Sequence, residues 1–205
     1  MRPDLIPALI LALLPGLAAA EPTYHRVTGV APDDTLNVRA APSADSADVG
    51  DLAHDQRGIE VSGLDPTGKW ARIVWQESNG WIATRFLTSD PVPRLGASGV
   101  PQGLTCGGTE PFWALDLTSS TVRYSDAMAA DYDMALTGVS VAEGRLGSPA
   151  VVGFSGPFAS GDAILAPDIC SDGMSDRDYP WRIDLLLTSG GTRRFISGCC
   201  RLPLD

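Results

Sequence analysis

Hydrophobic and polar residues alternate in short runs through the first part of the chain, and turn residues separate the runs. Leu36 and Val38 point to one side of an extended segment, while Asn37 and Arg39 point to the other. This pattern is typical of a strand with one buried face. Similar runs follow at residues 58–63, 69–75, 81–82 and 86–87. Because five short strands bury a core only by curling together, we expect a small barrel within residues 21–90.

The same alternation returns in residues 104–205. Trp181-Arg-Ile-Asp-Leu is the clearest case, and it predicts a sheet with one face in water. A weak helix is predicted at residues 125–133. Further strands are predicted at residues 113–118, 121–125, 135–141, 150–154, 163–166 and 193–196. The fold class is therefore all-β, with a small barrel followed by a second β-barrel or sandwich.

Residues 91–103 separate the two modules. Pro91, Pro93 and Pro101 oppose regular structure, and few side chains of this stretch are able to pack. We expect a linker rich in proline and glycine that acts as a hinge.

The first twenty residues have the pattern of a secretory signal. Arg2 precedes an apolar stretch at residues 5–17, and three alanines stand before Glu21, as signal-peptide cleavage requires. The stretch is too short, and too broken by proline, to span a bilayer as a helix, although a retained membrane anchor is the alternative. We expect residues 1–20 to be a signal peptide and its removal to leave no transmembrane anchor.

The charge of the chain excludes some partners. The formal net charge is −10, and both modules are acidic: residues 21–90 carry six basic and eleven acidic groups, and residues 91–205 carry eight and thirteen. An acidic surface repels phosphate backbones and anionic headgroups. We therefore expect no nucleic-acid partner and no membrane-surface partner.

All four cysteines lie in the second module, and an even number in an exported chain predicts disulfides. A bridge between the adjacent Cys199 and Cys200 conflicts with ordinary disulfide geometry. Cys106 and Cys170 are therefore each expected to pair with one of them, and the choice stays open. Either pairing draws widely separated segments together.

The ordered motifs of the first module resemble the bacterial SH3 domain family. They are L-N-V-R-x-x-P at residues 36–42, Gly50 before Leu52, G-K-W-x-R-I at residues 68–73, G-W-I at residues 80–82 and a terminal F-L at residues 86–87. The resemblance covers about residues 23–88. It implies a partly open SH3-like barrel that docks onto cell-wall material or peptides.

The candidate ligand-binding residues of this module are Arg39, Trp70, Trp75 and Trp81. Arg39 is able to pair with a carboxylate, which the stem peptides of the wall provide, or to act as a simple strand-capping donor. Three tryptophans do not all fit inside so small a barrel, and a partly exposed Trp is a common binding anchor. Packing of Trp70 and Trp81 in the core or at an edge is the favoured alternative.

Three dense motifs mark the second module: C-G-G-T-E-P-F-W at residues 106–113, C-S-D-G-M-S-D at residues 170–176 and G-C-C at residues 198–200. In this order they resemble an uncharacterised family of secreted bacterial β domains. The resemblance implies almost nothing about activity.

The disulfides are expected to gather a second candidate patch, formed by Glu110, Trp113, Asp172, Asp176 and Arg177. A calcium loop is disfavoured because Cys170 and Tyr179 stand where ligands are required. We expect no metal and no cofactor. The favoured role for these carboxylates is structural, as acceptors for backbone N–H groups or arginines in turns.

Catalytic residues are not expected. The chain holds two histidines, both in the first module, so the cysteines of the second have no neighbouring base. We expect a periplasmic or secreted envelope-binding or adaptor protein, not an enzyme, whose partner is peptidoglycan or an envelope peptide or protein. One alternative is a periplasmic inhibitor of lysozyme-type enzymes. A second is a wall hydrolase that uses the carboxylates of Glu110 and Asp172.

Overall fold

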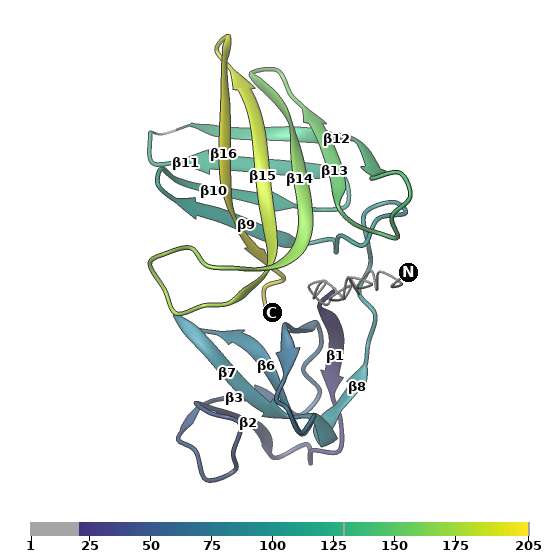
Figure 1. Cartoon of the computed structure of the whole chain (residues 1–205), viewed down its shortest axis with the longest axis vertical. Helices are drawn as coiled ribbons and strands as arrows, with labels where there is room; N and C mark the ends of the chain where they lie inside the picture. The colour runs from purple at the N-terminus through teal and green to yellow at the C-terminus, as the bar shows by residue number, and fades with distance from the viewer. Residues whose placement is uncertain (1–20, 129, 205) are drawn as a thin grey trace, which may run out of the picture.

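The computed structural model describes residues 21–128 and 130–204, and it confirms the all-β fold class. Two modules are stacked along the long axis of the molecule, with the smaller one formed by the N-terminal strands (Figure 1). The proposed signal peptide, residues 1–20, lies outside the described residues. Within the described part of the chain, no helix is long and apolar enough to cross a membrane.

The first module consists of two small antiparallel sheets, ordered β4-β1-β8 and β3-β2-β7-β6-β5. Its alternating residues face a common core, in which Val38, Ala71, Ile73 and Ile82 are almost completely buried. The short runs seen in the sequence are thus strands, although eight form where five were expected. Their bounds are β1 Thr23–Val27, β2 Thr35–Arg39, β3 Asp48–Ala53, β4 Ile59–Val61, β5 Gly63–Leu64, β6 Trp70–Trp75, β7 Ser78–Ala83 and β8 Leu87–Ser89. A 3-10 turn, Thr84–Phe86, precedes β8.

The second module is a closed antiparallel barrel of eight strands, so the choice between barrel and sandwich is decided. Each strand pairs with its neighbours along the chain, and the last strand returns to pair with the first. The strands are β9 Leu104–Thr109, β10 Phe112–Leu117, β11 Thr121–Asp126, β12 Asp131–Val141, β13 Ala150–Ser155, β14 Ala159–Cys170, β15 Tyr179–Ser189 and β16 Thr192–Arg201.

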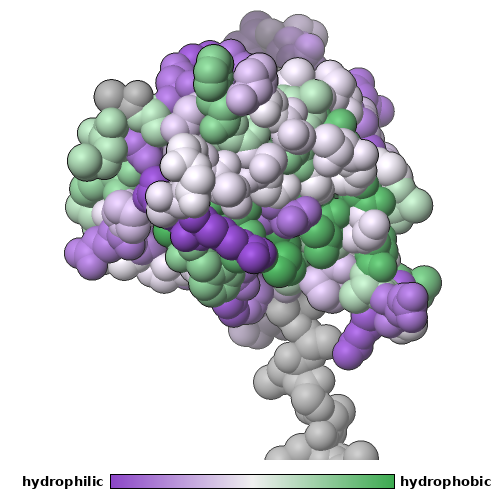
Figure 2. Space-filling view, turned by 90° about the horizontal axis from the view of Figure 1, so that it is seen from above, coloured by the Kyte–Doolittle hydropathy of each residue, from purple (hydrophilic) through white to green (hydrophobic). Residues whose placement is uncertain are grey.

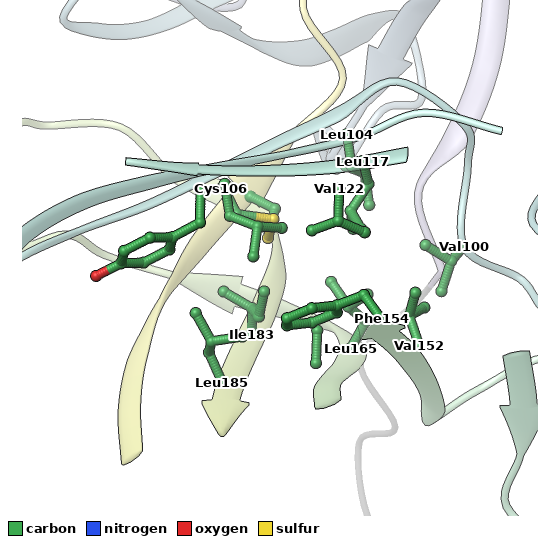
Figure 3. Close-up of a cluster of buried hydrophobic side chains, with 14 of the residues drawn as sticks. Val100, Leu104, Cys106, Leu117, Val122, Val152, Phe154, Leu165, Ile183 and Leu185 are labelled. Carbon is green, nitrogen blue, oxygen red and sulfur yellow. A yellow bond between two sulfur atoms is a disulfide. The ribbon is translucent and has the colours of Figure 1, made fainter. Parts of the chain in front are cut away.

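Inward-facing hydrophobic side chains, which alternate with outward-facing ones along the strands, fill the interior of the barrel. Residues at every second position of each strand point inward, and Figure 3 shows them meeting from opposite walls. Leu115, Val122, Leu165 and Ile183 have no exposed surface. A barrel of this strand number has an interior that side chains can fill. The barrel therefore provides a packed core for the surfaces described below.

The helix predicted at residues 125–133 is wrong. Ser125 and Asp126 end β11, and β12 begins at Asp131. The carboxylate of Asp126 accepts the backbone N–H of Met128 at 2.9 Å and that of Ala130 at 3.2 Å. Such side-chain acceptors stabilise turns. The alanines of this segment favour a helix locally, but the barrel requires a hairpin turn.

The expectation that residues 91–103 have little to pack is also wrong. Leu95 and Val100 are buried in the core of the barrel. The backbone N–H of Leu95 donates to the carbonyl of Val100 at 2.9 Å, and Arg94 pairs with Pro101 in an isolated bridge. The segment joins the modules as a folded turn that contributes to the barrel core.

Candidate functional site

A buried polar cluster joins the two modules. The carboxylate of Glu60 on β4 accepts the hydroxyl of Tyr24 at 3.0 Å, the indole Nε1–H of Trp181 at 3.0 Å and the backbone N–H of Leu202 at 2.7 Å. Burial raises the pKa of Glu60 to about 7, although these hydrogen bonds and Arg201 oppose the shift. Trp181 and Leu202 belong to the barrel and its C-terminal extension, so the carboxylate is fixed from both modules.

A second junction is the crossing loop, residues 171–178 between β14 and β15, which reaches the β6–β7 hairpin (Figure 1). Asp178 accepts Arg72 Nη1 at 2.6 Å, and its backbone N–H donates to Asn79 at 3.0 Å. Arg177 donates to the Gln76 carbonyl and to the Glu77 carboxylate. Instead of the expected hinge, polar contacts hold the modules together at two places.

Asp172 organises the crossing loop. Its carboxylate accepts the backbone N–H groups of Met174 at 3.0 Å and Ser175 at 2.8 Å. It also accepts the hydroxyls of Ser175 and Tyr179. Burial opposes ionisation, but the hydrogen bonds outweigh it and lower the pKa of Asp172 to about 2. The expected structural role of this carboxylate as a turn acceptor agrees with these contacts.

The disulfides are Cys106–Cys200 and Cys170–Cys199. Cys106 and Cys200 lie directly opposite each other on β9 and β16, inside the barrel. The second bridge ties the start of the crossing loop to the outer surface of β16. The pairing that the sequence left open is thereby resolved, and the expected convergence of the three motifs is confirmed. Two disulfides indicate an oxidising environment outside the cytoplasm.

The glycines of two motifs make room for Trp113. Its indole points into the barrel, where a Cβ added at Gly108 or Gly198 would collide with it. Trp113 is 5% exposed, and its Nε1–H has no hydrogen-bond partner among the described residues. Trp113 therefore lies beneath the candidate patch, whereas Glu110, Asp172 and Arg177 lie at its surface.

Two adjoining hollows, of about 240 and 230 Å³, lie where the crossing loop passes over β9 and β16. Their shared lining includes Gly107, Gly108 and Asp172. Glu110 and Arg182 line the first hollow, and Arg177, Tyr179 and Arg201 line the second. The three sequence motifs thus form a hollowed surface. Asp176 is exposed and lines neither hollow, although its backbone contacts Glu77 and Asn79.

In the first module, Arg39, Trp81 and Arg72 form one row across the outer face of the sheet. Trp81 on β7 is the direct cross-strand partner of Arg39 on β2 and of Arg72 on β6. Trp70 lies on the same face and is half-buried, as is Trp81. Arg39 donates to the Ser46 carbonyl at 3.2 Å and lies 3.7 Å from Asp48.

Trp75 lies on the opposite face from this row. It packs against the core of the first module and donates its Nε1–H to the carbonyl of Val49 at 3.0 Å. The structure therefore groups Arg39, Trp70 and Trp81 on one surface and separates Trp75 from them. Sequence reasoning missed Arg72 as a member of this row, although its alternation with Trp70 was visible.

Exposed hydrophobic side chains of the barrel include Phe112, Met128, Phe158 and Phe195. In the view from above, hydrophobic surface is interrupted by strongly hydrophilic side chains (Figure 2). The face seen in this view therefore presents a mixed hydrophobic and hydrophilic surface.

Comparisons with protein-family models, with curated proteins and with solved structures find no match for this chain. No family is identified, and both resemblances drawn from the motifs stay predictions. Among the residues that the structure describes, no group of three or more His, Cys, Asp or Glu side chains is placed to hold a metal ion.

Proposed function

We propose that this protein is an exported envelope-binding protein and has no catalytic role. Its first module would dock onto peptidoglycan or an envelope peptide through the outer face that carries Arg39, Trp70 and Trp81. The two disulfides support a location outside the cytoplasm. The periplasm or the extracellular medium is the proposed location.

The observation that carries this proposal is the position of Trp81 between two arginines. A half-buried indole offers a flat apolar surface to a sugar ring or side chain, and guanidinium groups recognise carboxylates. Arg72 already holds a carboxylate of the same chain, that of Asp178, at 2.6 Å. Arg39 has 24% of its side chain exposed and lies on the other side of Trp81.

The test is retention of the chain without residues 1–20 on purified sacculi. Retention is expected, and a double variant with Arg39→Gln and Trp81→Ala should lose most of it. Arg26→Gln is the matched control, because Arg26 is exposed on β1 outside this row. The proposal fails if the unaltered protein is not retained, or if the double variant binds as well as the control.

The hydrolase alternative requires a carboxyl group that donates a proton. The hydrogen bonds that lower the pKa of Asp172 to about 2 oppose that role at neutral pH. Unchanged muropeptide profiles with Glu110→Gln and Asp172→Asn would remove this alternative. Inhibition of a lysozyme by the intact protein would instead favour the inhibitor hypothesis.

A further inference from the structure

The carboxylate of Asp178, in the crossing loop of the barrel, is bound by two side chains of the first module. Its Oδ2 accepts Arg72 Nη1 at 2.6 Å and Asn79 Nδ2 at 3.2 Å. The backbone N–H of Asp178 donates to Asn79 Oδ1 at 3.0 Å. Arg72 and Asn79 together therefore bind both the carboxylate and the N–H of a single residue.

These two side chains belong to the outer face that carries the row of Arg39, Trp81 and Arg72. Arg72 on β6 lies directly opposite Trp81 on β7, and Trp81 lies directly opposite Arg39 on β2. Asn79 precedes Trp81 by two positions on β7, so both side chains point to the same side of the sheet. Asp178 therefore takes up the donors at one end of the face through which docking is proposed.

The crossing loop has other contacts that hold it in place. Arg177 donates to the Gln76 carbonyl and to the Glu77 carboxylate of the β6–β7 hairpin. The Cys170–Cys199 bridge ties the start of the loop to β16. Removing the carboxylate at position 178 is therefore expected to free its two donors without detaching the loop.

The ion pair between Arg72 and Asp178 is one that a ligand is able to displace. Arg72 has 26% of its side chain exposed and Asp178 has 34%. Partly exposed ion pairs contribute little to stability, because water screens the charges and competes for them. A guanidinium group recognises any carboxylate of suitable geometry. Replacing the internal carboxylate by that of a ligand therefore loses little binding energy.

We propose that Arg72 and Asn79 form a carboxylate subsite of the docking face, and that Asp178 occupies it as an internal competitor until a ligand replaces it. The ligand class is a peptide residue that presents a carboxylate beside an amide N–H, because Asp178 offers this pair of groups. The inference rests on the proposed docking function. It adds a subsite to that function and a contact that restrains its affinity.

Equilibrium binding to purified sacculi tests the inference on the chain that lacks residues 1–20. Asp178→Ala should bind about fivefold more tightly than the unaltered protein, the gain expected when a partly exposed ion pair no longer competes. Asp176→Ala is the matched control, since it removes the same charge from an exposed side chain of the same loop. The control should bind as the unaltered protein does.

Two further comparisons separate the subsite from a general loosening of the loop. Arg72→Gln added to Asp178→Ala should remove the gain. Sacculi whose carboxyl groups have been converted to amides with a carbodiimide and ammonia should also show no gain. Asp178→Asn, which keeps the shape of the side chain but not its charge, should give a gain of the same sign if Asp178→Ala lowers thermal stability.

The inference is overturned if Asp178→Ala binds sacculi no better than the unaltered protein, if the control gains as much, or if the gain survives Arg72→Gln or amidation. In each of these cases, retention that depends on Arg39 and Trp81 leaves the docking function standing. If neither the unaltered protein nor Asp178→Ala is retained, the docking function fails and the inference fails with it.

Discussion

Glu60 of the first module accepts the indole N–H of Trp181 of the barrel at 3.0 Å, and both side chains are buried. A carboxylate in such a place is costly unless donors surround it. Here the donors come from β1, from β15 and from the residue after β16, because Tyr24 and Leu202 complete the set. Separating the modules would remove two of these donors, so we expect the modules to unfold as one unit.

Stability should fall as the pH rises from about 4.5 to about 7, because burial raises the pKa of Glu60 across that interval. In this range the folded protein retains a proton that the unfolded chain has lost, so rising pH favours unfolding. A pKa difference of this size corresponds to roughly 3 kcal/mol. Urea denaturation at several pH values measures the change.

Glu60→Gln provides the comparison for this pH series. His25 acts in the opposite direction, because burial lowers its pKa from 6.5 and folding then disfavours its protonation. The difference between the unaltered protein and Glu60→Gln isolates the carboxylate. If both proteins show the same slope between these pH values, Glu60 is not the group that titrates.

Asp172→Ala should loosen the crossing loop, because four donor groups in Met174, Ser175 and Tyr179 lose their acceptor. We expect a loss of about 1–2 kcal/mol in the free energy of unfolding and faster amide exchange at Met174 and Ser175. Asp176→Ala is the control, since the side chain of Asp176 is exposed and only its backbone is bonded. Equal effects of the two substitutions would contradict the role given to Asp172.

Gly198→Ala should be strongly destabilising, by about 3 kcal/mol or more, because the new methyl group would collide with the Gly107 carbonyl and the Trp113 ring. Gly138→Ala on β12 should be nearly neutral, since nothing lies within 4 Å of a Cβ at that position. Thermal unfolding followed by circular dichroism compares the two. A stable Gly198→Ala protein would show that Trp113 does not need this space.

Mild reduction should open Cys170–Cys199 before Cys106–Cys200. Cys170 is partly exposed, whereas Cys106 and Cys200 are buried inside the barrel at 2% and 0% exposure. A reducing thiolate must reach a sulfur atom to attack it, so access decides the order. Differential alkylation followed by mass spectrometry reports the order, and early labelling of Cys106 would contradict it.

The sequence was informative where the chemistry of a residue type allows few structural arrangements. Alternation placed Leu36 and Val38 on the buried face of their strand, and Cys199 and Cys200 could not bridge each other without strain. The convergence of the three motifs followed from the cysteines alone. Residue type singled out Arg39, Trp70 and Trp81, but strand register was needed to place Trp81 beside Arg39.

Long-range partners were beyond the reach of the sequence. Leu95 and Val100 stand among prolines and glycines, so local composition hid their place in the barrel core. The residues around Glu60 in the sequence do not predict that Trp181 donates a hydrogen bond to it, because more than a hundred residues separate the two. The helix predicted at Ser125–Asp133 failed for a different reason: the pairing of β11 with β12 requires a hairpin turn there, which overrode the helix-forming alanines.

The chain closes its barrel with β16 and then returns to the first module, where Leu202 donates to Glu60 and Leu204 packs on the core. Ribosomes build proteins from the N-terminus, and many chains fold each domain as it emerges. Here the first module, which is synthesised first, lacks the contacts of Leu202 and Leu204 until the end of the chain has been made. Premature termination after Arg201 would therefore leave the barrel strands complete but deprive the first module of the contacts from Leu202 and Leu204.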